Sequence, residues 1–266
     1  MDWYPLWNSL RIALISCAAV FFLGIFAAYY IAKLPRTVKG VLDVVLTLPM
    51  VLPPTVVGYF LLLLFGAKRP LGIFFMEHFG VKLVMNWYSA IFASIVVAFP
   101  LMYRTARGAF ESLDPNMLDA ARTLGWSNGR IFLRLMLPLA WSSIASGTVL
   151  AFARALGEFG CTLFLAGNQL GSTRTIPIAI YFEWMNGNTE ATWFWTIVLL
   201  VFSFLVILFI NLWSRHTTRY RQKSSHEGRS PKPRRNGTRG GGRRRSAKGL
   251  REDSAGSADV LGEGVA

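Results

Sequence analysis

Charge, cysteine and histidine are all scarce in this 266-residue sequence. Only 16% of the residues are charged while 53% are hydrophobic, a balance that is too apolar for an ordinary soluble domain and indicates a membrane protein. The two cysteines, Cys17 and Cys161, form no CxxC pair and the three histidines are scattered, so the sequence predicts no disulfide framework, metal site or cofactor. No GxxxxGK[ST] motif occurs, so we expect nothing in the chain to bind the phosphates of ATP.

The net charge of +14 is distributed unevenly along the chain. Residues 1–214 carry a net charge of +5, and the last 52 residues carry +9. The basic balance therefore belongs mainly to the tail and does not by itself indicate a nucleic-acid-binding protein. We expect residues 216–266 to be a disordered basic tail, because they contain too few apolar residues to offset the entropy of ordering. Such a tail can attract anionic lipid, bind RNA, or be an extension without a partner.

Five apolar runs are long enough to cross a membrane, which takes about 20 residues. They lie near residues 12–32, 41–65, 88–103, 137–157 and 194–213. The sequence therefore predicts an all-α, polytopic membrane helical bundle of about five transmembrane helices over residues 1–215. The segment 158–183 is apolar in two pieces that are each too short to cross, so it is either a re-entrant hairpin or part of a sixth pass.

Lysine and arginine set the expected orientation, because cytoplasmic loops carry an excess of them. If the N-terminus lies outside, the loops near 33–39 and 104–136 and the whole basic tail lie in the cytoplasm, and they hold most of these residues. We therefore expect an extracytoplasmic N-terminus and a cytoplasmic C-terminus.

Prolines interrupt the second apolar run at Pro49, Pro53 and Pro54, with Gly58 following. Proline removes a backbone donor and kinks a helix. Inside a membrane, carbonyls freed in this way are tolerated only where they are buried in protein or line a watery cavity. The segment is therefore either a kink used for packing or the border of a translocation path, with Pro53 and Pro54 as candidate pathway residues.

Two ionisable residues, Arg154 and Glu158, lie near the expected outer end of the fourth run. An ionisable residue within a membrane domain suggests function. At spacing i, i+4 the two side chains can also simply pair on one helix face. The alternative is that Arg154 contributes positive potential to a pathway used by an anion. By the same spacing rule, we expect Asp43 to pair with Lys39.

The loop 104–136 is the longest polar stretch outside the tail. Asp114 can cap a helix that begins at Pro115, and Gly125 can end it in a left-handed conformation. The helix should have about ten residues and a length of roughly 15 Å. Ser127 can cap a second helix, which is bent at Pro138. The first helix either lies on the lipid surface or inserts into a groove on a soluble partner.

The apolar positions of the first helix repeat at helical spacing and form one face. They are Met117, Leu118, Ala121 and Leu124.

This loop resembles the EAA loop of ABC importer permeases. The family pattern is Glu-Ala-Ala, three residues, Gly, nine residues, Ile-x-Leu-Pro, and this sequence differs only in Asp119 for Glu and Leu135 for Ile. The resemblance implies a type I ABC importer permease fold in which the first loop helix is a cytoplasmic coupling helix that docks into an ATPase. The coupling residues that it implies are Asp119, Ala120, Ala121, Gly125, Leu137 and Pro138.

A more particular resemblance extends over residues 5–214. The stretches LPMVLPPTVVGYFLLLLFG, ARALGEFGCTLFLAGN and TRTIPIAIY are similar to molybdate permeases of this importer group. The resemblance implies a non-enzymatic subunit of the bacterial inner membrane that imports molybdate, or the nearly identical tungstate, with ATP hydrolysed by another chain. The implied partners are a second copy of the chain, two cytoplasmic ATPase subunits, an extracytoplasmic molybdate-binding protein and membrane lipid, with no nucleic acid.

The sequence leaves two other interpretations of the function open. The first is a permease for sulfate or another oxyanion, since sulfate permeases share the general layout and an ARALGE-like segment. The second is a non-transporting membrane protein whose basic tail binds lipid or nucleic acid.

Overall fold

The computed structural model describes residues 2–80 and 82–227, and their side chains as far as residue 208. The regular elements of this part of the chain are all helical, and Met1–His226 forms one compact unit. The helices are α1 (Tyr4–Ala32), α2 (Arg36–Val51), α3 (Pro54–Phe65), α4 (Pro70–Phe79), α5 (Trp87–Glu111), α6 (Pro115–Thr123), α7 (Asn128–Ile131), the π-helical segment η1 (Phe132–Met136), α8 (Leu137–Leu156), α9 (Gly160–Ala166), α10 (Ile176–Met185) and α11 (Thr189–Glu227).

Four helical stretches in the described residues are long and apolar enough to cross a membrane. They are α1, α5, the continuous stretch Asn128–Leu156 and residues Thr189–Leu208 of α11. A fifth span results if α2 and α3 are counted together. The predicted all-α bundle of about five spans is thus confirmed.

The second apolar run is broken more sharply than the sequence suggested. The axes of α2 and α3 differ in direction by 114°, so residues 41–65 are not one continuous helix. Leu52 is extended, and Pro53 and Pro54 occupy the N-cap and the first turn of α3. Because neither proline donates a backbone hydrogen bond, α2 ends here and α3 starts in a new direction.

The segment 158–183 contains two short helices, α9 with seven residues and α10 with ten. At 1.5 Å per residue, they are about 10 and 15 Å long, too short to cross a bilayer individually. Among the described residues, no sixth span is present.

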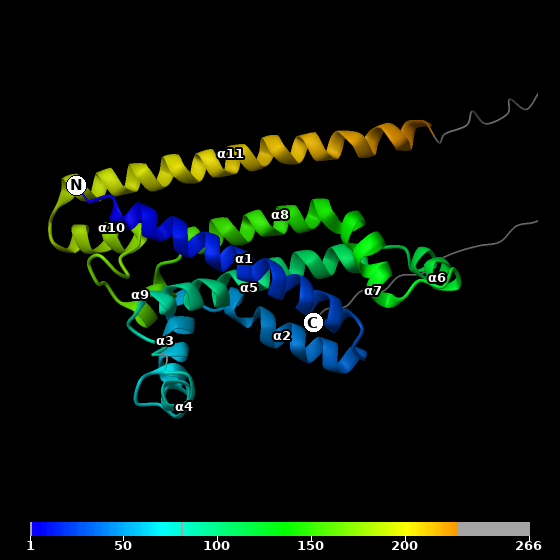
Figure 1. Cartoon of the computed structure of the whole chain (residues 1–266). Helices are drawn as coiled ribbons and strands as arrows, with labels where there is room; N and C mark the ends of the chain where they lie inside the picture. Colours follow the sequence, from blue (N-terminus) through cyan, green and yellow to red (C-terminus); the bar gives the residue numbers. More distant parts are fainter. Residues whose placement is uncertain (1, 81, 228–266) are drawn as a thin grey trace, which may run out of the picture. The chain divides into compact units, whose positions relative to one another are not determined.

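The core lies where α1, α5 and α8 pack side by side (Figure 1). The fully buried side chain of Met102 on α5 lies between Gly24 of α1 and Gly147 of α8. A Cβ atom on Gly24 would come within 2.7 Å of Met102 Cγ, and one on Gly147 within 2.8 Å of Thr105 Cβ. Small residues therefore allow the close helix approach that stabilises bundles in membranes.

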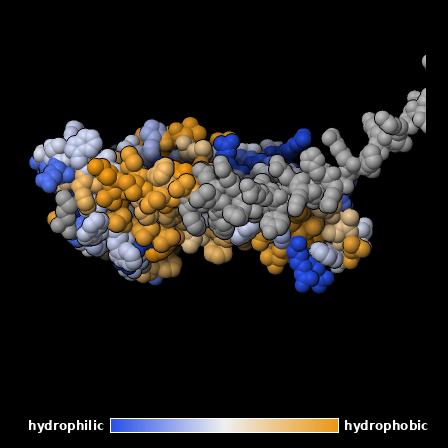
Figure 2. All heavy atoms as spheres, turned by 90° about the horizontal axis from the view of Figure 1, so that it is seen from above, coloured by the Kyte–Doolittle hydropathy of each residue, from blue (hydrophilic) through white to orange (hydrophobic). Residues whose placement is uncertain are grey.

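The connecting helices gather at the two ends of this core. Helices α6 and α7 lie at one end, and α9, α10 and the start of α1 lie at the other (Figure 1). On the face that Figure 2 shows, hydrophobic side chains form a broad patch inward of the hydrophilic ones at one end. A broad apolar surface beside a polar end is the pattern of a membrane-embedded bundle.

The last helix, α11, continues beyond residue 215, where the sequence placed the end of the permease domain, to Glu227. The greater part of the expected disordered tail, residues 228–266, lies outside the described residues.

Candidate functional site

The loop helix α6 begins and ends where its local sequence predicts. The Asp114 carboxylate accepts a hydrogen bond from the backbone N–H of Asn116 at 2.9 Å, and Pro115 begins the helix. Gly125 has φ = +76°, a left-handed conformation that side chains with a Cβ rarely adopt. The helix predicted from these caps is confirmed.

The end of α6 is a Schellman motif. The N–H of Gly125 donates to the Arg122 carbonyl at 2.9 Å, and the N–H of Trp126 donates to the Ala121 carbonyl at 3.2 Å. These two bonds satisfy carbonyls that the helix end leaves free. They also fix the angle at which the chain turns from α6 into α7.

The exposed face of α6 combines charge with a small side chain. Asp119 and Arg122 are exposed and form an ion pair at 2.5 Å, and Ala120 between them is also exposed. Ala121 is buried, whereas Leu124, which the sequence placed on the same apolar face, is 75% exposed. The exposed surface is thus partly charged and partly apolar. Because Ala120 has a small side chain, another protein can approach it closely.

Leu137 and Pro138 lie past α7, in the stretch that joins the loop to the membrane. Pro138 occupies the first turn of α8, and the π-helical segment η1 directly precedes it. A π-helical turn is one way for a helix to accommodate a residue that breaks its regular bonding. Leu137 is half-buried against the core, whereas Pro138 is exposed.

At the opposite end of the bundle, the proline break packs against α9. A Cβ on Gly160 would lie 2.9 Å from the Thr55 backbone nitrogen, and one on Gly58 would lie 2.8 Å from Cys161 Cα. Glycine at both positions therefore allows α3 to cross α9 with backbones in contact.

Arg154 and Glu158 lie beside the same crossing and pair with each other. Arg154 Nη1 donates to Glu158 Oε2 at 2.6 Å, and the Glu158 side chain is only 1% exposed. The second carboxylate oxygen accepts the backbone N–H of Cys161 at 2.7 Å, near the start of α9. The pairing suggested by the i, i+4 spacing is confirmed. Glu158 additionally ties the end of α8 to α9. Of the other candidate pathway residues, Pro54 lies beside Gly160 at the start of α9, and Pro53 precedes it as the N-cap of α3.

A charge network joins α2 to α5, and it corrects one prediction. Asp43 pairs with Arg107 and accepts a hydrogen bond from the Tyr103 hydroxyl, while Lys39 pairs with Glu111. Arg107 Nε also donates to Glu111 Oε1 at 3.0 Å. The expected pair of Lys39 with Asp43 is wrong, because α5 lies beside α2 and offers each residue an opposite charge.

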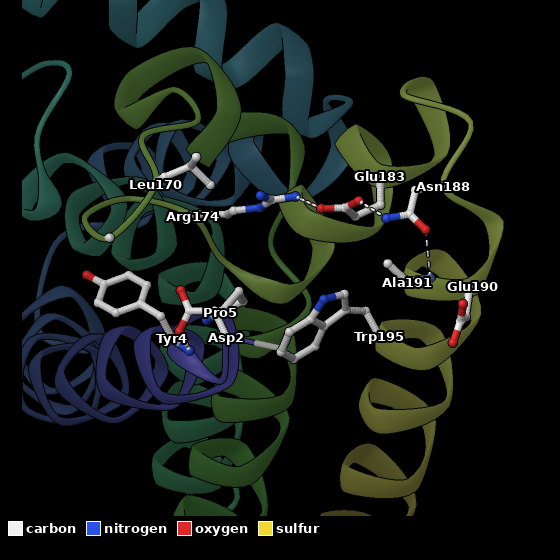
Figure 3. A pocket seen from close by; sticks show the side chains of 11 residues that line it. Asp2, Tyr4, Pro5, Leu170, Arg174, Glu183, Asn188, Glu190, Ala191 and Trp195 are labelled. Carbon is white, nitrogen blue, oxygen red and sulfur yellow. Dashed lines mark hydrogen bonds and ion pairs between the residues drawn. The ribbon is translucent and has the colours of Figure 1, made fainter.

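A cavity of about 340 Å³ opens beside the start of α1 (Figure 3). Its charged lining residues are Asp2, Arg174, Glu183 and Glu190. Arg174 Nη2 lies 2.7 Å from Glu183 Oε1, and Asn188 Nδ2 donates to the other oxygen of this carboxylate at 2.9 Å. With three carboxylates and one guanidinium that is already paired, the cavity repels an anion more than it attracts one.

Asn8 is a buried polar residue that the sequence reasoning missed. It is 1% exposed, and its Nδ2 donates to the carbonyls of Ser172 and Arg174 at 3.1 Å each. Its Oδ1 accepts the indole N–H of Trp87 at 2.8 Å. Asn8 thereby holds the loop before α10 against α1 and α5. An amide within an apolar helix was the available signal, but it lies before residue 12, where the first span was expected to begin.

Within the described residues, no group of three or more histidine, cysteine or acidic side chains is arranged to hold a metal ion.

The sequence matches a family described as "Binding-protein-dependent transport system inner membrane component" over residues 21–219. It is 44% identical to the molybdenum transport system permease protein ModB of Escherichia coli K12, over 66% of this chain and 79% of that protein. It is 40% identical to ModB of Haemophilus influenzae, over 65% of this chain and 76% of that protein.

Solved structures with a similar fold include two transporters. A bacterial ABC transporter involved in the import of the polysaccharide alginate has a TM-score of 0.67 and 19% identity, with 81% of this chain and 79% of that chain covered. The MetNI methionine ABC transporter in an inward-facing conformation has a TM-score of 0.60 and 15% identity, with 80% and 94% covered. At these identities, the likeness concerns the fold alone.

Proposed function

The chain belongs to the family of binding-protein-dependent transport system inner membrane components, and on this premise we propose that it is the permease subunit that carries molybdate through an ATP-driven ABC importer. The observation that carries the proposal is α6, a short helix with both ends fixed and an exposed face, in the loop between two membrane spans. The choice of molybdate rests on the relatives, which are named molybdenum transport permeases. The chain itself is a transport subunit and not an enzyme.

The proposed assembly contains two copies of this chain, two cytoplasmic ATPase subunits and an extracytoplasmic molybdate-binding protein. The proposed orientation has the N-terminus outside and α6 in the cytoplasm. It is supported by the loops at the α6 end, where lysine and arginine are concentrated. Residues 1–215 are proposed to be the permease domain, with 216–266 as a basic tail that transport does not require.

Coupling is proposed to run from α6 through one continuous helical stretch. Closure of the two ATPases moves α6, and the Schellman motif at Gly125 passes this movement to α7. The stretch Asn128–Leu156 then carries it across the bilayer to the Arg154–Glu158 pair, which holds α9 beside the proline break. Rigid movement of a packed helix is an established way to switch between two states of a binding site.

The junction of α3, α8 and α9 is the proposed border of the pathway. A dianion that passes it meets the Arg154 guanidinium, whose charge is already balanced by Glu158. Balanced charge suits passage, because an unpaired arginine that bound the dianion tightly would slow its release.

Molybdenum accumulation in cells tests the proposal. Cells that lack their own uptake system receive this chain with its cognate partners at limiting molybdate, with and without excess sulfate. Accumulation that persists under sulfate supports a molybdate permease, whereas its loss moves the assignment to a sulfate or broad oxyanion permease. Absence of accumulation by a correctly inserted, partner-bound protein contradicts an oxyanion function altogether.

A further inference from the structure

A groove of about 680 Å³ runs between α1 and the stretch that follows α6. Aromatic and aliphatic side chains form most of its wall, including Phe22, Phe26, Tyr29, Phe132 and Leu133. Phe22 is 70% exposed, Phe26 63% and Leu133 63%, although all three lie within apolar helical stretches. A volume of this size exceeds an ordinary packing defect and matches that of ligand sites.

One end of the groove carries a positive charge. Lys33 is the charged residue among the described residues that line it. Its Nζ lies 3.6 Å from the ring centroid of Tyr29 and 5.8 Å from that of Tyr30. The two aromatic faces hold the ammonium group at the groove's end. Within the described residues, Lys33 forms no ion pair with a carboxylate.

Lys33 lies at the depth in the membrane where lipid headgroups are found. Lys33 follows directly after Ala32, the last residue of the first membrane span, and tyrosines at span ends lie at the membrane surface. From Lys33, the apolar wall leads back along α1 through Tyr29 and Phe26 to Phe22. A cation at headgroup depth followed by an apolar channel along the span is complementary to a lipid with a negative headgroup and an acyl chain.

We propose that this groove is a binding site for one anionic phospholipid, with its phosphate at Lys33 and an acyl chain against Phe22, Phe26 and Leu133. The apolar wall excludes the imported dianion as occupant, because desolvating a doubly charged oxyanion there would be unfavourable. The site is separate from the proposed pathway, which lies at the other end of the bundle. Binding of the lipid in this groove does not depend on which anion is transported.

The groove lies beside the segment that follows α6, through which coupling is proposed to run. Tyr29 Oη donates to the Asn128 carbonyl at 3.4 Å, so α1 and α7 already meet at its rim. A bound lipid adds contacts between α1 and the stretch Asn128–Leu137 immediately after α6. It therefore braces the segment through which movement of α6 enters the membrane.

Photolabelling of the full chain tests the site. The purified full-length protein is placed in phosphatidylcholine nanodiscs that contain phosphatidylglycerol with a photoreactive acyl chain, and labelled peptides are mapped by mass spectrometry. We expect labels on peptides that contain Phe22, Phe26 or Leu133. Unlabelled phosphatidylglycerol should compete for them more effectively than phosphatidylcholine.

Charge variants distinguish this site from general attraction to basic residues. Lys33→Gln should lower labelling of the groove roughly fivefold, the factor that corresponds to about 1 kcal/mol per cation near a membrane surface. Lys33→Arg should retain it. Arg36→Gln is the matched control, because it removes an exposed cation three residues away that does not line the groove.

A second variant fills the groove without altering charge. Gly129 lines it, and a Cβ at this position meets no atom within 4 Å, so Gly129→Leu should fold normally while displacing the acyl chain. Three results would each overturn the proposal. The first is equal labelling in Lys33→Gln and the parent protein, and the second is labelling confined to tail peptides. The third is a set of cross-links that show a second copy filling the groove.

Discussion

Gly125 is the residue whose backbone conformation most restricts substitution in the loop. Its φ of +76° is strained for a β-branched residue by about 1 to 2 kcal/mol or more. Gly125→Val should therefore disturb the turn from α6 into α7 and lower ATP-driven uptake by about tenfold, given that 1.4 kcal/mol corresponds to a factor of ten. Membrane insertion should be unaffected, since a Cβ at this position meets no atom within 4 Å.

The matched control for this substitution is Gly125→Asn. Asparagine adopts the left-handed conformation more readily than other residues with a Cβ, so most of the uptake should return. Uptake rates and membrane content are measured for both variants together. Parent-like transport by Gly125→Val would exclude the proposed role of this turn.

The Arg154–Glu158 pair gives a second prediction for single residues. Glu158→Gln keeps the shape of the side chain and an acceptor for the Cys161 N–H but removes the charge that balances Arg154. We expect a loss of about 2 kcal/mol of stability, the lower part of the range for a broken buried pair, because Arg154 is 30% exposed. Thermal unfolding of the purified protein measures this loss.

A double-mutant cycle separates pairing from the other effects of Glu158→Gln. If the two side chains interact, Arg154→Gln combined with Glu158→Gln should destabilise the protein by less than the sum of the single substitutions. Strict additivity would mean that the ion pair contributes nothing to stability.

Among the helices, the crossing of α3 with α9 depends on the absence of a side chain at Gly58. A Cβ there would lie 2.8 Å from Cys161 Cα, and a backbone atom cannot move aside as easily as a side chain. Gly58→Ala should therefore cost about 1 to 3 kcal/mol through overpacking. Gly40→Ala on α2 is the control, because a Cβ at Gly40 meets nothing within 4 Å. Similar thermal midpoints for the two variants would contradict the tight crossing.

Elements defined by nearby residues were predictable from the sequence. The bounds of α6 follow from Asp114, Pro115 and Gly125, each of which acts on backbone groups within a few residues. The long spans follow from their apolar length alone. The pairing of Arg154 with Glu158 was also predictable, because the two residues lie about one helical turn apart.

Features that depend on distant segments were not predictable in the same way. Pro53 and Pro54 indicated a kink, but the bend of 114° accompanies packing of α3 on α9, about a hundred residues later in the sequence. The partner of Asp43 was predicted wrongly because the i, i+4 rule considers one helix, whereas Arg107 reaches it from another. The apolar groove at Lys33 likewise forms only when α1 meets the stretch after α6.

For the whole molecule, deletion of the tail distinguishes the proposed transport function from a function that resides in the tail. The last 52 residues carry +9 of the net charge, and the proposed coupling route uses none of them. Deletion of residues 228–266, which leaves α11 intact, should therefore preserve molybdenum uptake to within about twofold. Uptake is compared at equal membrane content of the two proteins. Abolished uptake at normal membrane content would favour a function that resides in the tail.

The central claim is that this chain forms a path for molybdate that ATP hydrolysis by another subunit drives. The most direct measurement is molybdate entry into proteoliposomes that contain the purified chain with its ATPase and binding protein, with ATP or a non-hydrolysable analogue supplied on the ATPase side. We predict entry only with hydrolysable ATP, and little effect of excess sulfate. Entry that does not depend on hydrolysis, or no entry by an assembled complex that hydrolyses ATP, would contradict the account.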